Sequence, residues 1–195
     1  RMEEGAMSRW VQRIPVLKAS PRMFTTYMNG VRMNLFEAAL KGLGGPEGLT
    51  TAEGRALAQG INDSTGRANL GKREGAIVFL NRSFFSPRLQ LSRMRMLLGV
   101  PMWRGSNRTR KYFAKQYARA LLSVGVMYAL GKLAEFDIEE DPRSSDFGKI
   151  RLRNTRVDPL GAFQQYIVFL SRQITGDTKT LKGEVQPLRP RQIPF

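Results

Sequence analysis

The chain has no cysteine and no histidine among its 195 residues. Their absence excludes disulfides, thiolate or imidazole metal sites, and every nucleophilic pairing of serine or cysteine with histidine. Catalysis would have to rely on carboxylates, Lys, Arg, Tyr or Ser, and we expect no enzyme, no cofactor and no metal. No signal segment opens the chain, and its first residue is Arg1 rather than Met, which indicates a piece of a longer protein.

Acidic residues are missing from residues 75–134, whereas the whole chain has 32 Lys and Arg against 16 Asp and Glu, a net charge of +16. Such an excess predicts attraction to phosphate-rich or anionic partners. An acidic cluster at residues 135–141 could pair with part of this basic block, but would leave a large positive excess. We therefore expect sequence-independent binding to DNA. The candidate nucleic-acid-binding residues are Arg82, Arg88, Arg93, Arg95, Arg104, Arg108, Arg110, Lys111, Lys115 and Arg119 of the block, with Lys149, Arg151 and Arg153 after it.

The apolar fraction of 42% is typical of a folded protein, and the chain predicts a mainly α-helical fold. We expect about five to seven helices, because Ser-Pro openings, polar caps and terminal glycines recur along the sequence. These signals place helix starts at Ser20 and Pro21, at Thr50 or Thr51, and at Ser86 and Pro87. Asn107 would cap the longest helix, residues 108–133. A last helix is expected over about residues 160–175.

One short β-hairpin is predicted near residues 148–158, in the string "FGKIRLRNTRVDP". Ile150 and Leu152 alternate with Lys149, Arg151 and Arg153, so one face can lie on the helical core while cations point outward. A lone hairpin is marginal in water, so we expect the long helix and the Phe163, Ile167 and Leu170 face of the last helix to clamp it. Residues 1–176 would form one helical domain, and residues 177–195 an extended, basic, proline-rich tail.

Two strings resemble chemical motifs without completing them. "GRANLGKR" matches the first seven positions of a phosphate-binding loop, but Arg73 stands where Ser or Thr must hold magnesium. The acidic cluster with Asp146 lacks the alternating spacing and central glycine of a calcium loop. Neither string predicts a nucleotide or metal site.

Residues 120–131 of the longest predicted helix carry no charge. Twelve residues extend only about 18 Å, short of a bilayer span, so a simple transmembrane helix is not expected. Small residues four apart, such as Ala114 and Ala118, allow another helix to approach closely. The stretch is either a central core helix or a face buried by a partner or a membrane surface. The residues of this candidate face are Ala118, Leu122, Gly125 and Ala129.

The strings "ASPRMFTTYMNGVRMNLFEAAL", "INDSTGR", "FFSPRL" and "DPRSSDFGKIRLRNTRVDPLGAFQQYIVFLSRQITG" together resemble a segment of bacteriophage large polyvalent proteins and related giant internal virion proteins. The similarity runs from about residue 19 to about residue 188. It implies packaging in the virion, delivery into the host with the genome, and no assigned active site. Members of that family are far longer than this chain.

The resemblance and the charge together predict a non-enzymatic structural and binding segment of a phage internal virion protein, packaged in or attached to the particle and ejected or retained. Its expected partners are DNA, other virion proteins such as portal, tail or internal proteins, and, less directly, the host membrane, within an oligomeric assembly. After ejection it would lie in the host cytoplasm or at the inner membrane. The alternatives are a cellular nucleic-acid-binding protein and an interfacial membrane-associated protein.

Overall fold

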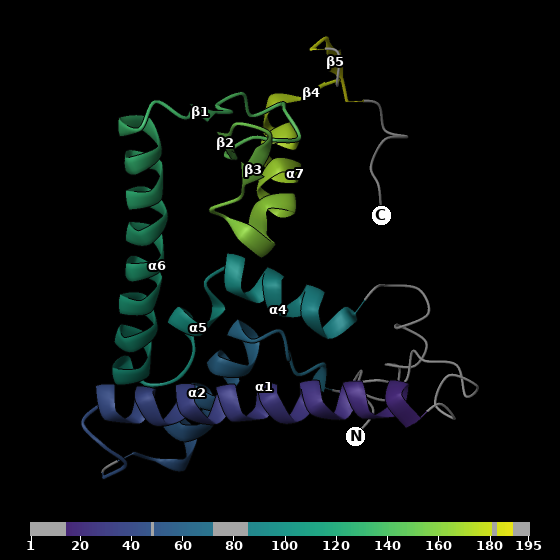
Figure 1. Cartoon of the computed structure of the whole chain (residues 1–195). Coiled ribbons are helices and arrows are strands. Elements are labelled where there is room, and N and C mark those ends of the chain that lie inside the picture. Colours follow the sequence, from purple (N-terminus) through teal and green to yellow (C-terminus); the bar gives the residue numbers. More distant parts are fainter. Residues whose placement is uncertain (1–14, 48, 72–85, 181–182, 189–195) are drawn as a thin grey trace. The chain divides into compact units, whose positions relative to one another are not determined.

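The structure, a computed structural model, describes residues 15–47, 49–71, 86–180 and 183–188, with side chains from residue 23 onward (Figure 1). The chain divides into two compact units, Arg1–Gln116 and Tyr117–Phe195, which we describe separately as unit 1 and unit 2. The described part is mainly helical with small antiparallel sheets, so the predicted fold class is confirmed. The predicted domain division at residue 176 stays a prediction.

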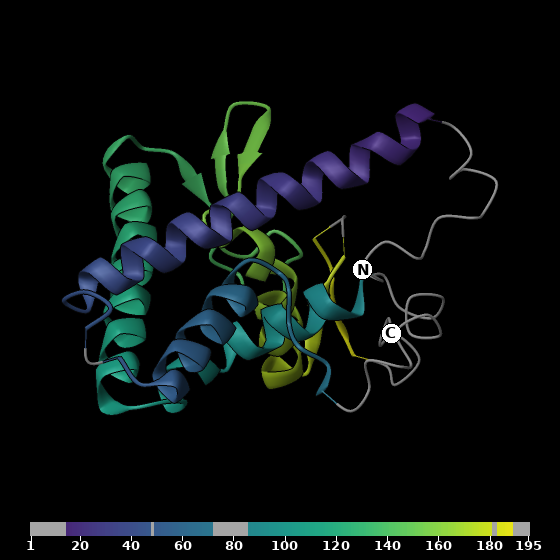
Figure 2. The same ribbon diagram turned by 90° about the horizontal axis from the view of Figure 1, so that it is seen from below.

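Unit 1 contains α1 (Pro15–Gly42), α2 (Thr51–Ser64), α4 (Pro87–Leu97), α5 (Val100–Trp103) and the first turns of α6 (Asn107–Leu133). Figures 1 and 2 show α1 as the long purple helix, with α2 packed beside it. Burial of apolar side chains between these helices stabilises the unit. Its core consists of Ala39, Leu57, Ile61 and Phe113, with Phe36, Leu40, Leu43, Met102 and Tyr112 packed around them.

The start of α2 shows why the sequence predicts a helix boundary there. Thr50 accepts a hydrogen bond at Oγ1 from the Glu53 backbone N–H at 3.2 Å, and the Glu53 carboxylate accepts one from the Thr50 backbone N–H at 3.0 Å. This reciprocal pair satisfies two donors that the first helical turn leaves unpaired. The prediction of a cap at Thr50 is confirmed.

Two predicted helix starts are wrong. Helix α1 begins at Pro15 and continues through Ser20 and Pro21. Helix α6 already includes Asn107, and the preceding Ser106 occupies the cap, because its carbonyl accepts from the Arg110 N–H at 2.9 Å. Asn and Ser are both common caps, so the pattern alone did not distinguish these adjacent positions. The predicted opening of α4 at Pro87 is confirmed.

Unit 2 contains the rest of α6, a three-stranded sheet, the short helix η3 (Gly161–Phe163), α7 (Gln164–Thr175) and a second strand pair. The strands β1 (Asp137–Ile138), β2 (Ile150–Leu152) and β3 (Thr155–Val157) are antiparallel in the order β1-β2-β3. The predicted hairpin is therefore confirmed, with β1 as an additional strand. Another antiparallel pair, β4 (Asp177–Lys179) and β5 (Val185–Pro187), lies in the range predicted as a tail.

The hairpin of β2 and β3 is held by both neighbouring helices, as predicted. Ile150 is buried, and its Cδ1 lies 3.3 Å from where a Cβ would stand on Gly131 of α6. Tyr128 of α6 donates its hydroxyl to the Gly148 carbonyl at 2.5 Å. From α7, Gln164 is buried and donates its side-chain amide to the Phe147 carbonyl. Leu170, however, is 46% exposed, so its predicted part in the clamp is wrong.

Candidate polyanion-binding surface

Three arginines gather at the free end of the hairpin. In the antiparallel register Arg151 stands directly opposite Arg156, while Leu152 stands opposite Thr155. A two-residue turn joins the strands, and its first residue, Arg153, has a positive φ of 53°. Arg151, Arg153, Asn154 and Arg156 line one open hollow of about 660 Å³. We call Arg151, Arg153 and Arg156 the hairpin arginines.

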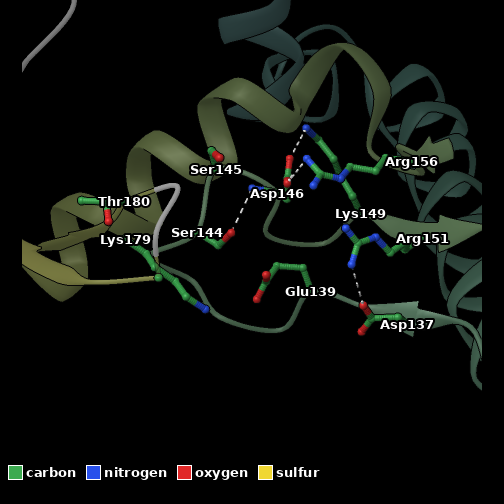
Figure 3. Close-up of a pocket in the computed structure, with 11 residues that line it drawn as sticks. Asp137, Glu139, Ser144, Ser145, Asp146, Lys149, Arg151, Arg156, Lys179 and Thr180 are labelled. Carbon is green, nitrogen blue, oxygen red and sulfur yellow. Dashed lines mark hydrogen bonds and ion pairs between the residues drawn. The ribbon is translucent and has the colours of Figure 1, made fainter. Parts of the chain in front are cut away.

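Two aspartates from neighbouring segments offset part of this charge (Figure 3). Asp146 binds Lys149 at 2.8 Å and also pairs with Arg156. The hydrogen bond from Lys149 is the main reason that the pKa of Asp146 lies below its ordinary value. Asp137 lies 3.8 Å from Arg151, with both side chains more than half exposed. Exposed pairs of this kind contribute little stability. No ion pair within the described residues includes Arg153.

A second cavity, of about 230 Å³, lies beside the hairpin and has mixed charge (Figure 3). Its aspartates, Asp137 and Asp146, pair with cations, and among the described residues no three carboxylates stand close enough to hold a metal ion. The arrangement is a network of ion pairs around two aspartates. The lining residues are Asp137, Glu139, Ser144, Ser145, Asp146, Lys149, Arg151, Arg156, Lys179, Thr180 and Gly183.

The loop that forms one wall of this cavity is cross-linked by Asp141. Its carboxylate accepts hydrogen bonds from Arg143 Nε at 2.9 Å and Nη2 at 3.2 Å, and lies 3.3 Å from Lys179 Nζ. The bonds from Arg143 are the largest cause that holds the pKa of Asp141 far below its usual range. The Arg143 carbonyl accepts from Arg172 Nε of α7 at 3.1 Å and from the Lys179 N–H at 3.0 Å. The loop is thus fixed to α7 and β4.

Several predicted nucleic-acid-binding cations serve the fold instead. Arg95 donates to the buried Asp63 carboxylate at 3.3 Å and to the Asn69 carbonyl at 2.9 Å. Arg108 donates to the Leu43 carbonyl. Because these guanidinium groups are engaged within unit 1, they are poorly placed for a phosphate. Lys149 is half-buried against Asp146. Arg88 and Arg93 are also half-buried.

The remaining predicted cations are exposed, apart from Arg82, which lies outside the described residues. Each unit carries its own set. Sequence reasoning missed Arg156, although the two-residue turn makes it the cross-strand partner of Arg151, and a register assignment would have found it. The exposed predicted cations are Arg104, Arg110, Lys111 and Lys115 in unit 1, and Arg119, Arg151 and Arg153 in unit 2.

The predicted packing or partner face of α6 is open to solvent. Ala118, Leu122, Gly125 and Ala129 are all exposed, and Leu122 retains 69% of its surface. Within residues 120–131 only Gly131 is buried, so the alternative of a central core helix is wrong. No helix in the part of the chain that the structure describes is long and apolar enough to cross a membrane.

Comparison with known proteins adds no relative. No protein-family model matches the chain, and neither the curated proteins nor the solved structures include one that matches it. The function proposed below is therefore argued from the charge, from the surface geometry and from the strings that resemble phage proteins.

Proposed function

We propose that this chain is a non-enzymatic binding segment of a phage internal virion protein, and that it binds duplex DNA without regard to sequence. The observation that carries the proposal is the set of hairpin arginines, exposed on one hollow of an anchored hairpin. The guanidinium group of arginine binds two phosphate oxygens through two parallel hydrogen bonds. A DNA backbone supplies phosphates regardless of base sequence, which matches a site built from guanidinium groups.

The pairing of Arg151 with Arg156 argues for an anionic partner. Like charges directly opposite each other on adjacent strands are destabilising. The fold places them there, with Asp137 beside Arg151 and with Asp146, which also binds Lys149, beside Arg156. A phosphate between the two guanidinium groups would add a favourable contact to both. The hairpin arginines therefore fit a bound polyanion better than a bare surface.

The hairpin is also held firmly enough to present these groups. Ile150 is buried, and the loop before it is bonded on one side to Tyr128 and on the other to Gln164. Groups fixed before binding lose less conformational entropy when the ligand arrives. The exposed cations of unit 1 and the overall charge of +16 would add long-range attraction.

The test is the salt dependence of DNA affinity, measured by fluorescence anisotropy with a short duplex of arbitrary sequence. Each phosphate contact contributes about −0.9 to the slope of log K against log salt. Changing Arg151, Arg153 and Arg156 to Gln should therefore make the slope shallower by about two to three. A matched control with the same charge change replaces exposed Lys41, Arg55 and Lys132 by Gln, and should change the slope much less.

The outcomes separate three cases. Equal changes in both triple variants would mean that overall charge, and not the hairpin, binds DNA. An unchanged slope in the hairpin variant would move the contact to the exposed cations of unit 1, such as Lys111 and Lys115. A wild-type chain that does not bind duplex DNA at low salt would contradict the proposal.

The virion setting rests on the resemblance and has its own test. Mass spectrometry of purified particles should detect peptides of the chain at a fixed copy number. Loss from particles emptied of DNA would indicate ejection, and retention would indicate a lasting contact with portal, tail or capsid. Absence from both kinds of particle would contradict this setting and leave a nucleic-acid-binding role inside the cell.

A further inference from the structure

The part of α6 that belongs to unit 2 exposes an unusual amount of apolar surface. Soluble proteins scatter exposed apolar side chains, whereas a contiguous group marks a contact with another molecule. One side of this segment packs within unit 2, where Gly131 lies against Ile138 and Ile150 and Tyr128 donates to the Gly148 carbonyl. The other sides carry Leu121 at 71% exposure, Leu122 at 69%, Val126 at 48%, Met127 at 42%, Leu130 at 59% and Leu133 at 80%.

The spacing along this segment suits a helix–helix contact. Ala118, Leu122, Gly125 and Ala129 recur at intervals of four, three and four residues, the repeat by which two helices pack side by side. Gly125 has no heavy atom within 4 Å of its Cβ direction, so another backbone can approach closely there. The apolar residues Leu122, Val126, Leu130 and Leu133 share a neighbouring stripe.

Residues of opposite charge lie at the two ends of this apolar segment. Arg119 precedes it on the same stripe, and Glu135 follows two residues after the last residue of α6. Both side chains are exposed, and neither is in an ion pair with another described residue. Lys132, by contrast, already pairs with Glu140 at 2.7 Å. Within the described residues, the segment therefore has an unpaired cation at its start and an unpaired anion at its end.

We propose that this face of α6 binds the same face of a second copy of the chain, with the two helices antiparallel. In this orientation Arg119 of each copy meets Glu135 of the other, and the apolar residues between them cover one another. A parallel pair would instead set Arg119 against Arg119 and Glu135 against Glu135. The antiparallel contact is self-complementary and closed, as a twofold dimer requires.

Other occupants fit the surface less well. An anionic membrane would attract Arg119 but repel the acidic residues that directly follow the helix, including Glu135, Asp137 and Glu140. Duplex DNA offers no apolar surface of this extent. The contact is also short, because residues 119–133 extend only about 22 Å along a helix. We therefore expect a reversible dimer that depends on concentration.

The first experiment measures the mass of the full chain, without DNA, by sedimentation equilibrium over a range of concentrations. The wild type should change from monomer to dimer. Leu122→Glu and Leu130→Glu should each weaken dimerisation at least about tenfold, because a charge would be buried in the contact. Ile174→Glu is the matched control, since Ile174 is 86% exposed on α7, outside the proposed face, and should leave the dimer unchanged.

The second experiment exchanges the charges and tests the orientation. Arg119→Glu and Glu135→Arg should each weaken the dimer about tenfold, because two attractive pairs become two repulsive pairs. The double variant, and an equal mixture of the two single variants, should recover the wild-type association. Both substitutions lie at exposed positions, so they test the contact even if the Leu variants fold poorly.

Several results would overturn the inference. If the chain stays monomeric at about 1 mM, the dissociation constant of any dimer is weaker than millimolar, and the proposed contact does not form. Single charge variants that dimerise like the wild type, or a double variant weaker than both, would exclude the antiparallel register. If the wild type is monomeric and Leu122→Glu lowers its melting temperature by circular dichroism, then this face of α6 is covered within the same molecule and not by a second copy. None of these readouts depends on DNA binding.

Discussion

The ring of Phe113 lies directly against the backbone of Gly60. Phe113 is on the first turns of α6, Gly60 is on α2, and both are buried. A Cβ on Gly60 would stand 2.7 Å from Cε2 and 2.8 Å from Cε1 of the ring, closer than real carbon atoms approach. The two helices of unit 1 can therefore pack at this point only because residue 60 has no side chain.

Gly60→Ala should destabilise unit 1 by about 1–3 kcal/mol, because the aromatic ring is rigid and must move. The control is Gly30→Ala in α1, where nothing lies within 4 Å and alanine should be neutral or stabilising by up to about 1 kcal/mol. Urea unfolding followed by tryptophan fluorescence measures the stability of both variants. Both tryptophans of the chain, Trp10 and Trp103, belong to unit 1, so the signal reports on that unit. A Gly60→Ala variant as stable as Gly30→Ala would contradict the packing.

Arg95→Met should destabilise unit 1 by about 3 kcal/mol, because it leaves the Asp63 carboxylate buried without its cation. Burial already raises the pKa of Asp63, and the loss of Arg95 should raise it further. The variant should consequently recover stability as the pH falls. Arg110→Met is the control in urea unfolding, because Arg110 is exposed and a surface change is worth within about 0.5 kcal/mol. Equal effects would mean that Arg95 is not structural.

Acidification should weaken unit 2 through Asp141 and Asp146, whose pKa values both lie below the ordinary value. A carboxylate with a lowered folded pKa gives its full stabilisation above the unfolded value, about 3.9 for Asp, and loses it as the pH falls through the folded pKa. Thermal melts by circular dichroism should show the loss below about pH 4. Asp141→Asn should melt lower at pH 7 yet change less with acidification; an unchanged pH profile would contradict the role of its ion pairs.

The sequence predicted the features that local chemistry determines. The cap at Thr50, the opening of α4 at Pro87 and the hairpin near residues 148–158 all follow from residues close to one another in the chain. The anchoring of the hairpin by α6 was also predicted, because an isolated hairpin is marginal. Two-residue periodicity separated Ile150 from Arg151 correctly, but Leu152, predicted to share the core face with Ile150, is 36% exposed.

Features that depend on distant partners were not predicted. Strand β1 has two residues, Asp137 and Ile138, and is defined by their pairing with Arg151 and Ile150 of β2. Arg95 appeared as one cation among many, because nothing in its neighbourhood shows that it reaches Asp63, 32 residues away. The apolar segment of α6 was predicted first as a core helix and only second as a partner or membrane face, since periodicity measures amphipathicity and not what lies opposite.

The positive φ of Arg153 lowers the stability of the hairpin turn, whereas its side chain supports the proposed DNA binding. Non-glycine residues in the left-handed region are strained by roughly 1 kcal/mol, and asparagine tolerates it best among them. Arg153→Asn should therefore raise the melting temperature of unit 2 slightly while making DNA binding weaker and less dependent on salt, effects of opposite sign in one variant. A selection for thermal stability alone would then remove the arginine from this turn. Its presence is consistent with a hairpin that gives up some stability for one more positive charge at its tip.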